Sequence, residues 1–337
     1  MNIYYIVDSL TGSLGNGITS QAMTWADILE KHQGIIVHKV NPWVSYSYKK
    51  GDIVHLFGSS GTWFLSATQN LKAKGCKVVW SPICDNIDNP VSQRLKTHLG
   101  SDKLQLYSLP MVRKKAYVVV DCVFVRSQYE KEYIMKAYRV VENKIRIVPL
   151  SISYDDHSHV NVDDRETFCL HISSISDERK NVLRLIKAAK KFGFRLVLAG
   201  KKGSVSQFKP LADEIGNSDN IEVMGFISEE QKLDLYRRAK VFALPSIKEG
   251  VGIVALDAAH FGCEVVITDV GGPKEYYGDL AWKVNPYSVD EIGQAILEAM
   301  TKTHQPALKT HVDKEYSKNS IADKLIKSYE NLRECSH

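Results

Sequence analysis

Short apolar runs alternate with helix-length segments along most of this sequence, and this alternation constrains the fold more than any other feature. Strands that alternate with helices build a parallel sheet with helices on both faces. The pattern therefore predicts an α/β domain over residues 1–152. Its predicted strands are 3–7, 35–40, 53–57, 77–81, 122–126 and 144–148, with helices at 18–31, 63–74, 91–99 and 128–136.

A polar stretch follows, and the alternation then starts again. Residues 153–166 are rich in Asp and His and carry no periodic pattern, which is typical of a linker. Residues 167–312 predict a second doubly wound, Rossmann-like domain, so that the carboxyl ends of two sheets face each other across a ligand-binding cleft. The expected strands are 167–173, 195–199, 221–223, 241–245 and 264–268, and the expected helices are 182–192, 229–238, 252–261 and 289–301.

The C-terminal segment, residues 313–337, has no strand after it. Within it, Ile321, Leu325 and Tyr329 recur at a spacing of four residues, as on one face of a helix. We expect this amphipathic helix, at 320–332, to cross back and pack on the first domain.

Composition excludes several classes of protein. The 337 residues are 44% hydrophobic and 25% charged, as in ordinary globular proteins, and no apolar run reaches the roughly 20 residues of a membrane span. Six scattered cysteines without a C-x-x-C pair predict free thiols in a cytoplasmic protein. Residues 1–152 hold 19 Lys and Arg against 11 Asp and Glu, a net charge of +8, and the rest of the chain carries −3. The first domain therefore either faces an anionic partner or carries solvated surface charge.

The strongest chemical signal is the segment 243–262, which reads ALPSIKEGVGIVALDAAHFG. A loop containing Glu249, Gly250 and Gly252 leads from a strand into a helix, and glycines there let backbone N–H groups approach an anion. Asp257 follows Glu249 by eight residues, about two helical turns. Spacing alone fits a phosphate-binding turn between two hydroxyl-binding carboxylates, and it also fits an ordinary turn whose carboxylates face solvent.

Residues 245–275, PSIKEGVGIVALDAAHFGCEVVITDVGGPKE, resemble the donor-binding signature of retaining glycosyltransferases of family 4, which have the GT-B fold. The similarity extends upstream through HISSISDERKN, VLAG and EVMGFISEEQKLDLY. It is weaker in the first half, in DIVHLFG, DCVFVRSQYEKEY and KIRIVPLSI. The closing YSKNSIADKLIKSYENL is similar to the last helix of the family.

This resemblance implies roles for the matching residues. Glu249 would hold the ring hydroxyls of the donor sugar, and Asp257 stands where the family usually has a Glu on the ribose hydroxyls, one methylene shorter. The backbone N–H groups that bind the phosphate would be those of Gly250, Val251, Gly252 and Ile253. The residues that pack against the nucleotide base would be Gly200, Gly225, Phe226 and Ile227.

The cations that similar enzymes place on the donor diphosphate are only partly present. The Arg position of the family reads Ser174 here, whereas the Lys position is Lys180. Positive charge is required because the departing diphosphate gains negative charge as the glycosidic bond breaks. We expect Lys180 to supply one cation and either Arg179 or Lys201 to supply the second.

The resemblance also points to positions in the first half. The loop TGSLGNGI closes over the donor phosphate in similar enzymes, which makes Gly17 the expected contact, although turn geometry alone also favours glycine. Many relatives carry a His near the donor sugar where this chain has Asp85, which either replaces the His or caps a helix. His55, at the end of DIVH, is a candidate on the acceptor or sugar side, or else a strand residue packed below the cleft.

The resemblance implies a retaining GT-B hexosyltransferase that moves a sugar from a UDP- or GDP-sugar onto a saccharide acceptor. We expect a lipid-linked acceptor in the synthesis of a bacterial surface polysaccharide, such as O-antigen or capsule. The basic first domain would meet an anionic membrane surface at the inner face of the plasma membrane.

Other classes of site are not supported by the sequence. No D-x-D motif or metal-ligand cluster occurs, so we expect neither a metal nor another cofactor. Basic residues do not interleave with aromatic residues as in nucleic-acid-binding motifs, so we expect no nucleic-acid partner. A nucleotide-sugar 2-epimerase and a non-catalytic carbohydrate-binding protein of the same fold remain as alternatives.

Overall fold

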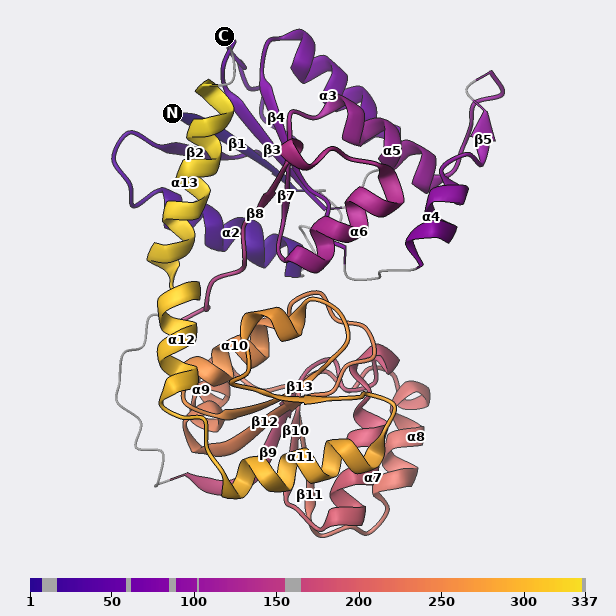
Figure 1. The fold of residues 1–337 in the computed structure, drawn as a ribbon, viewed down its shortest axis with the longest axis vertical. Coiled ribbons are helices and arrows are strands. Elements are labelled where there is room, and N and C mark those ends of the chain that lie inside the picture. Colours follow the sequence, from indigo (N-terminus) through magenta and orange to yellow (C-terminus); the bar gives the residue numbers. More distant parts are fainter. Residues whose placement is uncertain (8–16, 59–61, 85–88, 102, 155–164, 335–337) are drawn as a thin grey trace. The chain divides into compact units, whose positions relative to one another are not determined.

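The structure, a computed structural model, describes residues 1–7, 17–58, 62–84, 89–101, 103–154 and 165–334. The chain divides into two compact units, one made of Met1–Ser151 and Lys318–His337 and the other of Ile152–Ser317. Each unit has a parallel sheet with helices on both faces (Figure 1), which confirms the predicted α/β class. None of the described helices is both long and apolar enough to cross a membrane.

The first unit is built on a six-stranded parallel sheet in the order β2-β1-β3-β4-β7-β8. The strands are β1 (Asn2–Val7), β2 (Ile36–Lys39), β3 (Ile53–Phe57), β4 (Lys77–Ser81), β7 (Cys122–Val125) and β8 (Ile145–Ile147). The helices are α2 (Gly17–Leu29), α3 (Thr62–Ala73), α4 (Pro90–Lys96), α5 (Leu109–Val119), α6 (Gln128–Tyr138) and the short η1 (Glu142–Lys144). Between α4 and α5, β5 (Gly100–Ser101) pairs antiparallel with β6 (Leu106–Tyr107).

The second unit also has six parallel strands, in the order β11-β10-β9-β12-β13-β14. The strands are β9 (Glu166–Ile172), β10 (Leu196–Ala199), β11 (Ile221–Gly225), β12 (Ala239–Leu244), β13 (Glu264–Thr268) and β14 (Trp282–Val284). The helices are α7 (Val182–Phe192), α8 (Val205–Ile215), α9 (Glu229–Arg238), α10 (Ile253–His260), α11 (Val289–Thr301) and α12 (Ala307–Tyr316), with the short turns η3 (Glu178–Lys180) and η4 (Pro273–Tyr276).

Local sequence explains where these elements lie. The central strands β10, β12 and β13 are almost entirely buried and apolar, as expected for parallel strands covered on both faces. Two helices of the second unit begin with a capping box. Ser204 and Gln207 form the one at α8, and Ser228 and Gln231 form the one at α9.

Six helices and strands of the structure are absent from the sequence-based prediction, namely α5, α8, α12, β5, β6 and β14. Pro210 lies inside α8 and interrupts its helical pattern, whereas the proline in the first turn of α5 is compatible with a helix. The C-terminal segment also differs from the single unit expected at 313–337. α12 ends at Tyr316 within the second unit, and α13 (Lys318–Glu334) belongs to the first.

Helix α13 is joined to the sheet of the first unit through Tyr329. Its hydroxyl lies 2.6 Å from Nδ1 of His55 and 3.0 Å from the hydroxyl of Tyr5. The ring of Tyr329 also packs against Phe124, with centroids 5.3 Å apart. Because Tyr5, His55 and Tyr329 are all buried, each polar group depends on the others for a hydrogen-bond partner.

The variant Tyr329→Phe tests this anchor. It leaves two buried polar groups without their partner, so we expect the free energy of unfolding to fall by about 1–3 kcal/mol in urea denaturation. Tyr236→Phe is the matched control, since Tyr236 is equally buried but its hydroxyl has no hydrogen-bond partner among the described residues. Equal free energies of unfolding in the two variants would contradict the role of the Tyr329 hydroxyl in joining α13 to the sheet.

Candidate functional site

The strand order of the second unit reverses between β9 and β12. β10 and β11 lie on one side of β9, and β13 and β14 lie beyond β12. Where the order reverses, the loops leaving the two strands run apart and open a crevice at the carboxyl edge of the sheet. The loop after β9 leads to η3, and the loop after β12 leads to α10. These loops hold the residues that the sequence analysis expects to be catalytic.

Lys180 and Glu249 meet at this edge. The Nζ of Lys180 donates to Oε2 of Glu249 at 2.6 Å, and the hydroxyl of Ser246 donates to the same oxygen at 3.1 Å. The side chains of Lys180 and Glu249 are 20% and 12% exposed, so the pair is shielded from solvent without being enclosed. The structure therefore brings together two residues that lie 69 positions apart in the chain.

Asn181 holds the two loops in place. It is buried and has a left-handed backbone conformation, with φ at 61°. Its Nδ2 donates to the carbonyl oxygen of Pro245 at 2.9 Å and to that of Pro286 at 2.6 Å. The N–H of Ile247 also donates to the carbonyl oxygen of Arg179 at 2.8 Å. The ion pair is thus positioned by hydrogen bonds outside it.

The loop after β12 enters α10 through Gly252. Gly252 has φ at 74°, a left-handed conformation that favours glycine, and a Cβ there would lie 2.8 Å from Cδ2 of Leu244, whose side chain would have to move. No described side chain caps the helix, and the N–H of Ala255 already donates to the carbonyl oxygen of Gly252, which leaves the N–H groups of Ile253 and Val254 to bind an anion. Gly250 and Val251 are buried in the same loop.

Gly200 and Gly225 follow or end two neighbouring strands, β10 and β11. The N–H of Gly200 donates to the carbonyl oxygen of Gly225 at 2.7 Å. A Cβ on Gly200 would lie 1.8 Å from the carbonyl oxygen of Ser173, so no other residue fits. Phe226 is 78% exposed and Ile227 is partly buried. This edge therefore presents an aromatic ring on which a flat base could stack.

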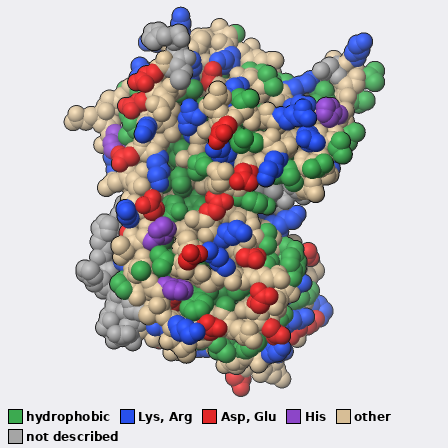
Figure 2. Space-filling view, in the orientation of Figure 1, with side chains coloured by type: hydrophobic (Ala, Val, Ile, Leu, Met, Phe, Trp, Pro, Cys, Tyr) green, Lys and Arg blue, Asp and Glu red, His purple; other side chains and the backbone are tan. Residues whose placement is uncertain are grey.

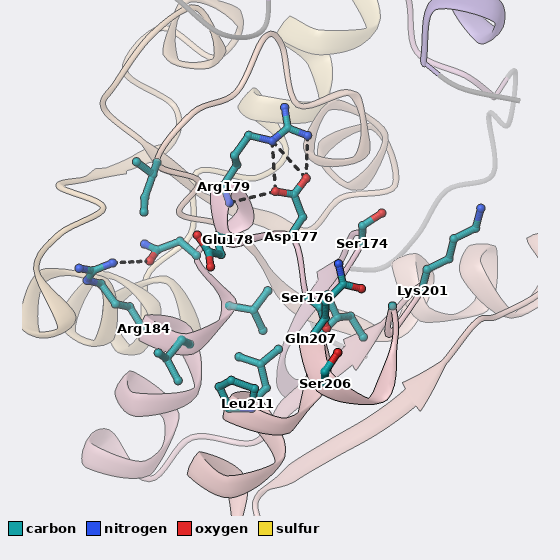
Figure 3. A pocket seen from close by; sticks show the side chains of 17 residues that line it. Ser174, Ser176, Asp177, Glu178, Arg179, Arg184, Lys201, Ser206, Gln207 and Leu211 are labelled. Carbon is teal, nitrogen blue, oxygen red and sulfur yellow. Dashed lines mark hydrogen bonds and ion pairs between the residues drawn. The ribbon is translucent and has the colours of Figure 1, made fainter. Parts of the chain in front are cut away.

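A cavity of about 1000 Å³ opens beside the loop after β9, between the first turns of α7 and α8 (Figure 3). This volume lies at the upper end of the range for small-molecule sites. Lys180 and Glu249 are not among its lining residues. Arg179 lines the cavity while the next residue turns to Glu249, so the cavity and the ion pair share η3. The polar and charged lining residues are Ser174, Ser176, Asp177, Glu178, Arg179, Asn181, Arg184, Lys201, Ser206 and Gln207.

The two candidates for a second cation differ in their partners. The guanidinium of Arg179 binds both carboxylate oxygens of Asp177, with the shortest distance 2.6 Å, and holds the pKa of Asp177 below its usual value. Lys201 is exposed and pairs with no carboxylate among the described residues, and Figure 3 shows its side chain extending away from Arg179. The positive charge of Arg179 is therefore largely neutralised, and that of Lys201 is not.

Asp257 does not have the surroundings that the sequence analysis expects. It lies within α10, is 2% exposed, and its Oδ1 accepts the backbone N–H of Ser153 at 2.8 Å. Burial raises the pKa of Asp257 to about 6, and the hydrogen bonds from Ser153 oppose that rise. This short side chain is enclosed and bound to the protein's own backbone, and its contact with ribose hydroxyls stays a prediction.

Of the first-unit candidates, the structure describes His55 and Gly17. His55 is completely buried, with its Nε2 2.8 Å from the hydroxyl of Ser81, and burial lowers its pKa well below the ordinary value. It is a packed strand residue and not a ligand contact. Gly17 is the exposed first residue of α2, and no described atom would meet a Cβ there within 4 Å. Asp85 and the loop before Gly17 lie outside the described residues.

Comparison with known proteins identifies the family. Residues 155–327 match the model described as "Glycosyl transferases group 1", which is more than half of the chain. The chain belongs to the glycosyl transferases group 1 family.

Several curated proteins resemble this group 1 glycosyltransferase. O-antigen chain mannosyltransferase B of Escherichia coli is 29% identical over 140 residues, 40% of this chain and 36% of that protein. An uncharacterized glycosyltransferase of Methanocaldococcus jannaschii is 26% identical over 162 residues, 43% of this chain and 41% of its own length. A D-inositol 3-phosphate glycosyltransferase of a Mycobacterium species is 27% identical over 166 residues, 45% and 38% of the two chains. The chain thus matches about two fifths of the length of these relatives.

Solved structures extend the likeness to the whole chain. Sucrose-phosphate synthase of Thermosynechococcus elongatus aligns over 100% of both chains with a TM-score of 0.72 and 16% identity. Anabaena HepE in complex with UDP aligns over 98% of this chain and 100% of its own, with a TM-score of 0.73 and 15% identity. At these identities the likeness shows the fold, which is that of GT-B glycosyltransferases.

The structure adds two residues to the site of this group 1 glycosyltransferase that the sequence analysis does not single out, Asn181 and Ser246. His171, in β9, is completely buried like His55 and is a packed strand residue. Burial lowers the pKa of His171 to about 4, so its neutral ring donates from Nδ1 to the carbonyl oxygen of Ala243 and accepts at Nε2 from the hydroxyl of Ser173. The preference of Asn for the residue before a helix, and the Pro-Ser pair of the motif, are the sequence signals for Asn181 and Ser246.

The pH dependence of stability tests the buried state of Asp257. A carboxyl whose pKa is higher in the folded than in the unfolded protein binds its proton more tightly when folded, so its contribution to stability is lost as pH rises from about 4 to about 6. The rise from 3.8 to about 6 corresponds to about 3 kcal/mol. In Asp257→Asn this loss is absent, because the amide oxygen still accepts from Ser153 and does not titrate.

Urea denaturation of both proteins from pH 4 to pH 7 measures the effect. We expect the free energy of unfolding of the wild type, minus that of Asp257→Asn, to fall by about 3 kcal/mol over this range. Titration of the other carboxylates cancels in the difference. A difference that does not change with pH would place Asp257 in contact with solvent.

Proposed function

We propose that this chain transfers a sugar from a UDP- or GDP-sugar to a saccharide acceptor, with retention of anomeric configuration. The observation that carries the proposal is the contact between Lys180 and Glu249 where the strand order reverses. A group 1 glycosyltransferase needs a carboxylate for the sugar hydroxyls and a cation for the departing phosphate, and this contact supplies both within one crevice.

Glu249 orients the sugar in this proposal. Its two contacts, with Lys180 and Ser246, both reach Oε2, so Oε1 is the oxygen assigned to a ring hydroxyl of the donor. Donor phosphate then competes with Glu249 for the ammonium of Lys180. The apo ion pair keeps both groups close to the geometry that the reaction uses, which lowers the cost of reorganisation on binding.

The transfer step breaks the bond between the anomeric carbon of the sugar and the β-phosphate oxygen. A new bond forms between that carbon and the acceptor hydroxyl oxygen on the same face, and the acceptor proton passes to the departing phosphate oxygen. Negative charge grows on the diphosphate as the bond breaks. Lys180, Lys201 and the first-turn N–H groups of α10 are the positive groups assigned to it, without a metal ion.

The remaining assignments concern substrates. Phe226, Gly200 and Gly225 are assigned to the base and Gly17 to the donor phosphate. HepE in complex with UDP has the same fold, which favours a uridine nucleotide. The similarity to O-antigen chain mannosyltransferase B supports a saccharide acceptor in surface polysaccharide synthesis, and we assign a lipid-linked form of it.

Turnover assays with a panel of UDP- and GDP-sugars and saccharide acceptors test this function. We expect one donor to be consumed with formation of a glycoside, and Glu249→Gln and Lys180→Met each to lower kcat by about 100-fold or more. Glu230→Gln and Lys187→Met, which change exposed residues of the same unit, are the matched controls and keep wild-type rates.

Other products would contradict the proposal. Conversion of the donor to its epimer without an acceptor would identify a 2-epimerase. Saccharide binding without turnover of any donor would identify a carbohydrate-binding protein.

A further inference from the structure

Exposed leucines gather on one part of the first unit, from α4 through the β5–β6 hairpin to the start of α5. Leu95, Leu104 and Leu106 are 66%, 70% and 60% exposed. Figure 1 shows the hairpin projecting beside α4, and Figure 2 shows hydrophobic side chains together over this projection with cationic side chains between them. We call it the leucine surface, made of Val91, Leu95, Leu99, Leu104, Leu106 and Leu109, all more than one third exposed. Clustered exposure of this kind is characteristic of a binding surface.

The charge around the leucine surface is strongly positive. Residues 89–115 contain six Lys and Arg and a single acidic residue, Asp102. Arg94, Lys96, Lys103 and Lys114 form no ion pair with any carboxylate that the structure describes. Leucines interspersed with unpaired cations form the pattern of segments that lie in the interface of an anionic bilayer, where apolar side chains enter the lipid and cations meet the headgroups.

A basic cavity of about 310 Å³ lies beside the leucine surface. Arg94 and His98, which line it, adjoin Leu95 and Leu99 in the chain, and no carboxylate is among the described lining residues. Arg94 lies in the last turn of α4 and therefore also complements the helix dipole. Lys114 comes from the middle of α5, so the helix dipole does not account for the presence of a positive charge at this position. The complete lining is Arg94, Thr97, His98, Lys114, Ala137, Tyr138 and Arg139.

We propose that the leucine surface docks the protein on an anionic lipid bilayer, with its leucines in the interface and a lipid phosphate in the basic cavity. This inference rests on the proposed function, because docking on a bilayer would bring the enzyme to a lipid-linked acceptor. The docking residues themselves are separate from all residues assigned to the donor. Arg94, Lys114 and Arg139 would bind the headgroup phosphate, as guanidinium and ammonium groups bind phosphate oxygens elsewhere.

Flotation with vesicles tests the docking without any sugar. The full chain is mixed with vesicles of phosphatidylcholine alone, or of phosphatidylcholine and phosphatidylglycerol at two to one. We expect the wild type to float with the anionic vesicles only. Leu104→Ser with Leu106→Ser, and Arg94→Gln with Lys114→Gln, should each weaken this binding about tenfold or more.

The matched control is Lys209→Gln with Lys302→Gln, which removes the same charge from exposed positions of the second unit and should float like the wild type. All substituted leucines are exposed, and circular dichroism confirms that each variant is folded. Flotation equal to wild type in both surface variants, or none in the wild type, would overturn the inference. Self-association that the leucine variants abolish would instead assign the surface to a second copy of the chain.

A transfer assay with a soluble saccharide acceptor distinguishes failure of the membrane-docking inference from failure of the proposed function. If transfer proceeds and no vesicles bind, the docking inference alone is wrong. If vesicles bind and no donor turns over, the docking stands and the proposed function is wrong.

Discussion

The site depends on one interaction, the contact of an ammonium and a carboxylate across two loops. Removing Lys180 and Glu249 from water costs free energy, which the 2.6 Å contact and the hydroxyl of Ser246 offset. Loss of either partner would leave a shielded, unpaired charge. The ion pair therefore favours the loop conformations in which the two side chains are in contact.

The rest of the second unit places those loops. The reversal of strand order between β9 and β12 separates them, and Asn181 joins them again through the carbonyl oxygen of Pro245. Its second bond, to the carbonyl oxygen of Pro286, reaches the loop after β14. Gly200 and Gly252 stand where a Cβ would collide with its surroundings. The crevice is therefore preorganised by backbone geometry, and the charged side chains add their chemistry to a frame that is already rigid.

Features that depend on local sequence could be predicted. The strand 264–268 and the helix 289–301 have the predicted bounds, because apolar patterning alone determines them. The family resemblance singled out Glu249 and Lys180 separately, one for the sugar and one for the diphosphate, and the ion pair between them is a finding of the structure. The enclosure of Asp257 could not be predicted, since its partner Ser153 lies 104 residues away and contributes only its backbone N–H. Helix α8 escaped prediction because Pro210 interrupts its pattern.

Calorimetric titration of UDP, GDP and their common sugars into the wild type and Glu249→Gln tests the central claim most directly. The account predicts that one nucleotide sugar binds more tightly than its parent nucleotide. It also predicts that Glu249→Gln loses this additional affinity while its affinity for the nucleotide stays the same. Absence of nucleotide binding, or a sugar-dependent gain that survives in Glu249→Gln, would contradict the account.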